Sequence, residues 1–133
     1  MEKDLLALLL ASASVGAIVG TRITPIAREQ GGILPAVTLQ RISGGPEYAD
    51  DGEVGIQGAR VQFDCWGDTY ASVKDLAIAV TNELSAVQDV TQGATTFIYI
   101  LLEEERDAGR EAGSNADEYL YRVSLDFMVW SNF

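Results

Sequence analysis

The sequence of 133 residues lacks histidine altogether and has a single cysteine, Cys65. Histidine is the side chain that most often transfers protons near neutral pH and most often binds transition metals, so its absence disfavours both kinds of site. One cysteine cannot form an internal disulfide bond, and no histidine is present to activate it as a nucleophile. Cys65 alternates with Val61 and Phe63 on the apolar side of its segment, so we expect a buried structural thiol.

Positive charge is also scarce. The chain has 9 lysine and arginine residues against 20 aspartate and glutamate residues, which gives a formal net charge of −11. Such a chain repels nucleic-acid phosphates and disfavours tight DNA binding, although DNA can still pass close to it without being held. Apolar residues make up 47% and charged residues 22%, as in an ordinary globular protein, and the length predicts one domain over residues 1–133.

No apolar run is long enough to cross a membrane, and the N-terminal candidate, Leu5–Ala13, is soon followed by Gly16. The same run resembles the apolar stretch and cleavage site of a secretory signal, so a secreted binding domain released near its end is an alternative. Glu2 and Asp4 stand where a signal needs positive charge, and acidic residues suit the first turn of a helix. We therefore expect a first helix here.

Two segments, Ala59–Trp66 and Glu118–Trp130, alternate apolar and polar side chains with a period of two. This pattern is typical of strands with one face on a core and the other in contact with water or a partner. We expect function to reside in contacts made by the polar face rather than in chemistry. The candidate interface residues are Arg60, Gln62, Asp64, Trp66, Arg122, Asp126 and Trp130.

Further segments complete the predicted fold. Apolar residues recur at helical spacing from Tyr70 to Val87, which predicts the clearest helix. Ala36–Ser43 alternates like a strand, and Thr95–Leu102 is almost continuously apolar, which indicates burial on both faces or a subunit contact. The order α-β-β-α-β-β predicts an α+β fold, a mainly antiparallel four-stranded sheet with two helices packed on its apolar face.

Two acidic segments are predicted to be loops. Glu47–Gly58 contains no lysine or arginine, so we expect a flexible, negatively charged arm in solvent. Its acidic residues are Glu47, Asp50, Asp51 and Glu53. Glu103–Asp117 is the second predicted loop, because glycine, serine and asparagine interrupt its charged residues.

The acidic residues of the two alternating strands could also serve chemistry. Asp64 and Asp126 lie on the polar faces, and with Glu103 they could form a carboxylate site for an ion of the magnesium type. Arg60 and Arg122 lie on the same faces and could instead pair with these acids across the strands. We favour the pairing, because neither a nearby lysine nor a phosphate-binding loop accompanies the acids. We therefore predict no enzyme, no catalytic residue, no metal site and no cofactor.

The chain contains, in this order, the segments Val19–Ile23, Val37–Gly44, Ala59–Trp66 and Tyr121–Trp130. Together they resemble the tail completion or tail terminator proteins of long-tailed bacteriophages and of gene transfer agents. The likeness extends from about Asp4 to Trp130, and it leaves Glu47–Gly58 and Asp107–Asp117 without a match. No single segment is specific, and the ordered set carries the resemblance.

The resemblance implies a structural virion protein that assembles in the host cytoplasm into a homo-hexameric ring at the head-proximal end of the tail tube. Such a ring stops growth of the tube and joins the tail to the head. Its partners would be the tail tube protein and a head connector or neck protein, with no membrane. DNA would pass through the ring without specific binding, and the acidic arm that contains Glu47, Asp50, Asp51 and Glu53 would face this channel.

Besides the secreted binding domain, two alternatives to a tail completion protein remain. Another head-tail joining protein, such as a neck or head-closure subunit, would share the size and the charge of this chain. A metal-dependent enzyme that uses Asp64 and Asp126 belongs to a different class and is disfavoured by the cross-strand arginines.

Overall fold

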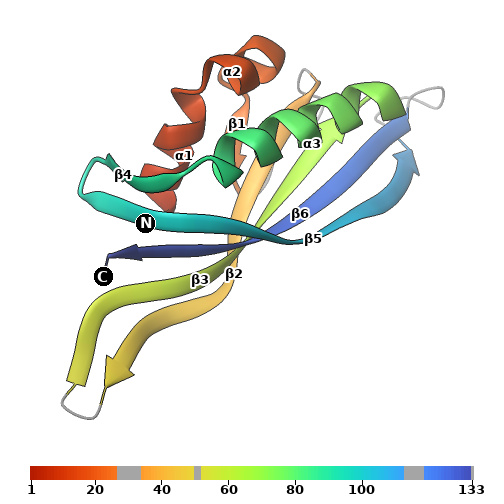
Figure 1. Ribbon diagram of the computed structural model, residues 1–133. Helices are drawn as coiled ribbons and strands as arrows, with labels where there is room; N and C mark the ends of the chain where they lie inside the picture. The colour runs from red at the N-terminus through yellow and green to blue at the C-terminus, as the bar shows by residue number, and fades with distance from the viewer. Residues whose placement is uncertain (27–33, 50–51, 113–118, 133) are drawn as a thin grey trace.

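The computed structural model describes residues 1–26, 34–49, 52–112 and 119–132. Within these residues the chain forms three helices and six strands (Figure 1). The helices are α1 (Glu2–Leu10), α2 (Ala13–Val19) and α3 (Tyr70–Ser85). The strands are β1 (Ile23–Pro25), β2 (Ala36–Ala49), β3 (Gly52–Gly67), β4 (Gln88–Gln92), β5 (Thr95–Ala112) and β6 (Tyr119–Asn132).

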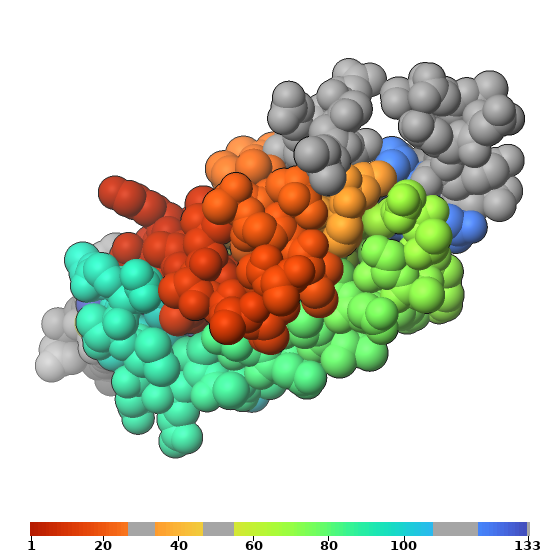
Figure 2. All heavy atoms as spheres, turned by 90° about the horizontal axis from the view of Figure 1, so that it is seen from above, coloured from red at the N-terminus to blue at the C-terminus, as the bar shows by residue number. Residues whose placement is uncertain are grey.

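The strands form one sheet in the order β1-β2-β3-β6-β5-β4. β1 runs parallel to β2, and every other neighbouring pair is antiparallel. Figure 1 shows a curled sheet with all three helices on one side of it. The central strands thus have an inner face toward the helices and an outer face away from them. Figure 2 shows the helical side from above, with α1 and α2 (red to orange) beside α3 (green). No described helix is long and apolar enough to cross a membrane.

The core lies between the helices and the inner face of the sheet. The rings of Phe63 and Phe127 meet there edge to face, with their centroids 5.6 Å apart. The other buried apolar residues include Ala59, Val61, Cys65, Val123, Leu125 and Val129 on the two central strands, and Val73, Leu76, Ala77, Val80 and Leu84 on α3. Burial stabilises the fold by roughly 1.5–3 kcal/mol for each large apolar side chain. The two alternating segments of the sequence are therefore the centre of the fold.

Cys65 is fully buried in this core, which confirms the prediction of a structural thiol. Burial raises the pKa of the Cys65 thiol well above its usual range, and the nearby carboxylate of Asp64 acts in the same direction. The thiol therefore stays protonated and unreactive in the folded chain.

Side-chain caps fix the start of two helices. The Oγ of Ser12 accepts a hydrogen bond of 3.3 Å from the backbone N–H of Val15, and the Oγ1 of Thr69 accepts one of 3.1 Å from Ser72. Caps of this kind contribute about 1 kcal/mol each. α2 ends at Gly20, whose φ of 60° lies in the region that favours glycine.

The prediction of a four-stranded sheet with two helices is wrong, although the chain is α+β. The predicted order lacks α2, β1 and β4. β1 is only three residues long and ends in Pro25, which it tolerates because it pairs with β2 alone. β4 is a polar edge strand, so its sequence shows no apolar alternation.

The two segments predicted to be acidic loops are largely strand. β2 and β3 continue as a long hairpin in which Gly45 lies opposite Gly58 and Tyr48 lies opposite Glu53. Figure 1 shows this hairpin reaching beyond the part of the sheet that the helices cover. β5 likewise continues to Ala112, opposite Tyr119. A two-stranded ribbon away from the core can be exposed to water on both faces. It therefore does not need the alternation of apolar and polar residues by which strands are predicted.

Candidate functional site

The outer face of the sheet gathers the polar and aromatic side chains of the three central strands. Directly opposed residues on neighbouring strands share a face, so the register assigns them. β3 contributes Arg60, Gln62, Asp64 and Trp66. β6 contributes Arg122, Ser124, Asp126, Met128 and Trp130, and β5 contributes Tyr99, Leu101, Glu104 and Arg106. All seven residues predicted to form an interface therefore lie on this one face.

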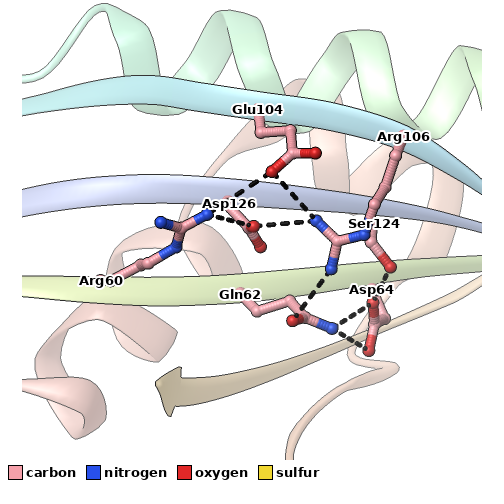
Figure 3. Close-up of polar contacts among 7 residues, drawn as sticks. All are labelled: Arg60, Gln62, Asp64, Glu104, Arg106, Ser124 and Asp126. Atoms are coloured by element: carbon pink, nitrogen blue, oxygen red, sulfur yellow. Dashed lines mark hydrogen bonds and ion pairs between the residues drawn. The ribbon is translucent and has the colours of Figure 1, made fainter. Parts of the chain in front are cut away.

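Asp126 on β6 is the centre of a charged cluster that joins three strands (Figure 3). Its Oδ2 accepts hydrogen bonds of 2.8 Å from Arg60 Nη2 on β3 and of 2.8 Å from Arg106 Nη1 on β5. The carboxylate of Glu104 lies 3.5 Å from Arg60 and 3.8 Å from Arg106. The Asp126 side chain is only 5% exposed, whereas both arginines are 39% exposed. The cluster thus has a buried acid under a partly exposed rim of arginines.

The arginines determine the charge state of Asp126. Burial raises the pKa of this carboxyl, but the hydrogen bonds and positive charges of Arg60 and Arg106 outweigh burial and leave the pKa below its usual value. Asp126 is therefore ionised at neutral pH. Its other oxygen, Oδ1, is buried and has no hydrogen-bond partner among the described residues.

A second set of contacts extends this cluster along β3 to Asp64. Arg106 Nη2 donates to Gln62 Oε1 at 3.3 Å, and Gln62 Nε2 donates to the two carboxylate oxygens of Asp64 at 3.0 and 3.1 Å. The hydroxyl of Ser124 also donates to Asp64 (Figure 3). Asp64 and Asp126 are thus linked through the guanidinium of Arg106 and the amide of Gln62.

The two tryptophans mark opposite ends of the outer face. Trp66 Nε1 donates to Thr38 Oγ1 at 3.2 Å, and the guanidinium of Arg122 lies 5.3 Å from the Trp66 ring centroid. The Trp130 ring lies over Gly58, where an added Cβ would come within 2.7 Å of it. Tyr99 lies beside Trp130, with ring centroids 6.1 Å apart. Aromatic residues held in this way are typical of protein interfaces.

The proposed cross-strand pairing is correct in part. Asp126 pairs with Arg60, as expected, whereas Arg122 lies over the Trp66 ring and forms no ion pair with an acid among the described residues. Glu104 and Arg106 are not among the predicted interface residues, because they fall in the segment predicted to be the second acidic loop. Glu103 is exposed and does not join Asp64 and Asp126. In the described part of the chain, no three histidine, cysteine, aspartate or glutamate side chains come together to hold a metal ion.

The acidic arm is described only in part. Asp50 and Asp51 lie outside the described residues, and the side chains of Glu47 and Glu53 lie outside them as well. The backbone places Glu47 in β2 and Glu53 in β3, near the end of the hairpin.

The apolar stretch of β5 is only partly buried. Phe97 and Ile100 belong to the core, whereas Tyr99, Leu101 and Leu102 are 40%, 52% and 37% exposed. Burial on both faces, one of the two readings of this segment, is therefore wrong for the isolated subunit. The other reading, a subunit contact, stays a prediction.

Comparisons with known proteins agree on one kind of relative. The family model described as "Tail completion protein gp17" matches residues 3–132. A solved structure described as "Virion of native gene transfer agent (GTA) particle" contains a chain with the same fold, with a TM-score of 0.76. The two chains are 18% identical, and the alignment covers 100% of this chain and 95% of that one. Comparison with curated proteins gives no match.

Proposed function

The chain belongs to the tail completion protein gp17 family, whose members are structural and not enzymes, and on this premise we propose that it closes the tail of a phage-type particle. Six copies form a ring at the head-proximal end of the tail tube. The ring ends growth of the tube and joins the tail to the head connector. The finished protein is then part of the virion, after assembly in the host cytoplasm.

The observation that carries this proposal is the extent of the family match, which takes in residues 3–132 and therefore both halves of the sheet and all three helices. The related fold in a gene transfer agent virion supports the same kind of particle. The site supports a role in contacts, because its acids are engaged by arginine, glutamine and serine side chains.

A ring subunit needs two unlike surfaces, because each copy meets one neighbour on each side. The outer face has a suitable composition for one contact with a copy, the tube or the connector. Interfaces are rich in tryptophan, tyrosine, methionine and arginine, and this face carries all four. We propose that Arg60, Gln62, Asp64, Trp66, Arg122, Asp126 and Trp130 belong to such a contact.

The net charge of −11 fits a ring through which DNA moves. Acidic side chains that line a channel repel phosphates and keep DNA from adhering. We assign this role to the acidic arm that contains Glu47, Asp50, Asp51 and Glu53. If these residues lie farther from the channel than a Debye length, about 8 Å at physiological salt, the assignment fails.

Particles made without this chain test the proposed function. We expect tubes of unregulated length that are not attached to filled heads, and normal particles when the chain is supplied again. Electron micrographs of both preparations measure tail length and attachment. Finished tails on heads in the absence of the chain would contradict the proposal.

The same preparations separate this role from that of a neck or head-closure subunit. Purified chain added to free tail tubes and to filled heads should cap the tubes. Binding to the portal of the heads, with no effect on the tubes, would instead support the alternative.

A further inference from the structure

Two long edges of the sheet have no neighbouring strand among the described residues. β1 covers β2 only over Val37–Leu39, and β4 covers β5 only up to Tyr99. The stretch Gln40–Pro46, which we call the β2 edge, and the stretch Ile100–Asp107, which we call the β5 edge, therefore present unpaired backbone N–H and C=O groups. Open edges of this kind bind strands from other molecules.

We propose that the β5 edge of one copy pairs with the β2 edge of the next, so that the sheet continues from subunit to subunit. This inference rests on the ring of the proposed function and names the contact that closes it. Because the two edges are different, each copy uses one of them toward each neighbour. Such head-to-tail contacts generate rings rather than dimers.

The two edges lie at the same position along the strand direction. When the register is followed from β2 through β3 and β6 to β5, Gln40 lies level with Glu104. In the same way, Ser43 is level with Leu101. Copies related by rotation about an axis along the strands can therefore bring these edges together with little shift. Three antiparallel steps separate β2 from β5, so the two strands run in opposite directions, and the contact between copies would be antiparallel.

Exposed apolar side chains lie on both edges. Leu101 and Leu102 on the β5 edge are 52% and 37% exposed, and Ile42 on the β2 edge is 45% exposed. A groove of about 420 Å³ opens beside the β2 edge, with Ile26, 74% exposed, in its wall. It is lined by Glu2, Pro25, Ile26, Leu39, Gln40 and Arg41. Leu102 corresponds in register to Arg41, and both lie on the inner face, so pairing of the edges would bring Leu102 of one copy to the groove of the next.

The charges of the two edges are complementary. Glu103 on the β5 edge is exposed and forms no ion pair within the described chain, whereas Lys74 on α3 engages Glu105 and Asp107. On the β2 edge, Arg41 is in contact with Glu2 at 3.4 Å. Pairing of the edges would bring Arg41 close to Glu103 of the neighbouring copy. An attraction of this kind selects the β5 edge against a second β2 edge.

Each edge also contains one irregularity. The pairing of β2 with β3 skips Ile42, and the pairing of β5 with β6 skips Glu103. Bulges of this kind bend and twist a strand. Bulges also protect an edge against pairing with strands of unmatched shape, so a bulged edge favours a specific partner over open-ended aggregation.

Disulfide trapping in assembled particles tests the pairing. We would combine Leu101→Cys with Ser43→Cys in one variant and with Gln40→Cys in another, so that a small shift along the edge is covered. Paired residues on antiparallel strands have Cα atoms about 4.5–5.5 Å apart, within reach of a disulfide. Cys65 is buried and does not interfere. We expect a ladder of covalent oligomers from at least one double variant, and only monomers from the matched single variants.

The outcomes separate this inference from the proposed function. If mass measurement or microscopy shows a ring but neither double variant gives disulfide-linked oligomers, only the edge pairing is overturned. Crosslinked dimers from Leu101→Cys by itself would also overturn it, because they would show two β5 edges in contact. A chain that forms no ring on tubes or in particles would overturn both proposals.

A charge exchange gives a second test that does not depend on crosslinking. Glu103→Lys should weaken assembly by about tenfold, equivalent to about 1.4 kcal/mol, and Arg41→Glu in the same chain should restore much of the loss. The matched control is Asp75→Lys, which makes the same change of charge on the exposed side of α3. Equal effects of Glu103→Lys and Asp75→Lys would contradict a specific contact at Glu103.

Discussion

Asp126 holds together the charged contacts of three strands through one carboxylate oxygen. Replacing it by asparagine would remove the charge and leave Arg60 and Arg106 facing each other. We expect Asp126→Asn to lower the free energy of unfolding by about 1–3 kcal/mol, less than for a fully buried ion pair because the arginines reach solvent. Denaturant unfolding measures the change. The exposed Asp75→Asn on α3 is the control, and an equally small effect of both substitutions would contradict the role of Asp126.

The low pKa of Asp126 also predicts how this effect depends on pH. A carboxyl whose pKa is lower in the folded than in the unfolded chain stabilises the fold above the unfolded pKa, about 3.9, and loses this contribution as the pH falls through the folded value. The difference in unfolding free energy between the native chain and Asp126→Asn should therefore be constant near neutrality and shrink below about pH 4. A difference that stays unchanged in strong acid would contradict the ion pairs.

Among the elements, the hairpin of β2 and β3 depends on a close approach to β6. Gly58 lies under the Trp130 ring, whereas Gly45, directly opposite on β2, has open space where a Cβ would stand. We expect Gly58→Ala to displace Trp130 and to cost about 1–3 kcal/mol, with a change in tryptophan fluorescence. Gly45→Ala is the matched control and should leave both readouts nearly unchanged. Equal responses of the two variants would show that the Trp130 side chain can move away from residue 58 without a cost in stability.

Most of the elements that bury apolar side chains are those that the sequence predicts, although α2, which the prediction lacks, also buries Val15 and Val19. Val61, Phe63 and Cys65 on β3 and the alternating residues of β6 are inner-face positions, and the spacing of Val73, Leu76 and Val80 matches α3. These patterns arise because only one face of each element meets the core. The outer-face position of Arg60 and Asp126 follows from the same alternation.

Elements outside the core leave weaker signals. β4 is polar because it lies at the edge, and the acidic end of β5 meets α3 through the ion pairs of Lys74 with Glu105 and Asp107 rather than through apolar side chains. Arg106, which shares Asp126 with Arg60, is therefore not predicted from the sequence pattern. The spatial neighbourhood of three distant strands cannot be inferred from alternation alone, because alternation fixes the face of a residue but not the order of the strands.

For the molecule as a whole, the excess of acidic over basic residues predicts that the chain does not bind DNA. With a net charge of −11, the chain should not bind a short DNA duplex at about 0.15 M salt with the 10⁻⁴–10⁻⁶ M affinity typical of non-specific binders. Fluorescence anisotropy of a labelled duplex measures this directly. Saturable binding that weakens as salt is added would reveal a local basic surface and would contradict a passive channel.

The position of Cys65 also gives the molecule a chemical reporter of its own motion. Its sulfur lies in the core between the sheet and the helices, so an alkylating reagent reaches it only when this core opens. The rate of alkylation under native conditions thus counts these openings without any engineered label. Subunits bound between two neighbours should be alkylated more slowly than free subunits. The ratio of the two rates would measure how much assembly reduces opening of the core around Cys65.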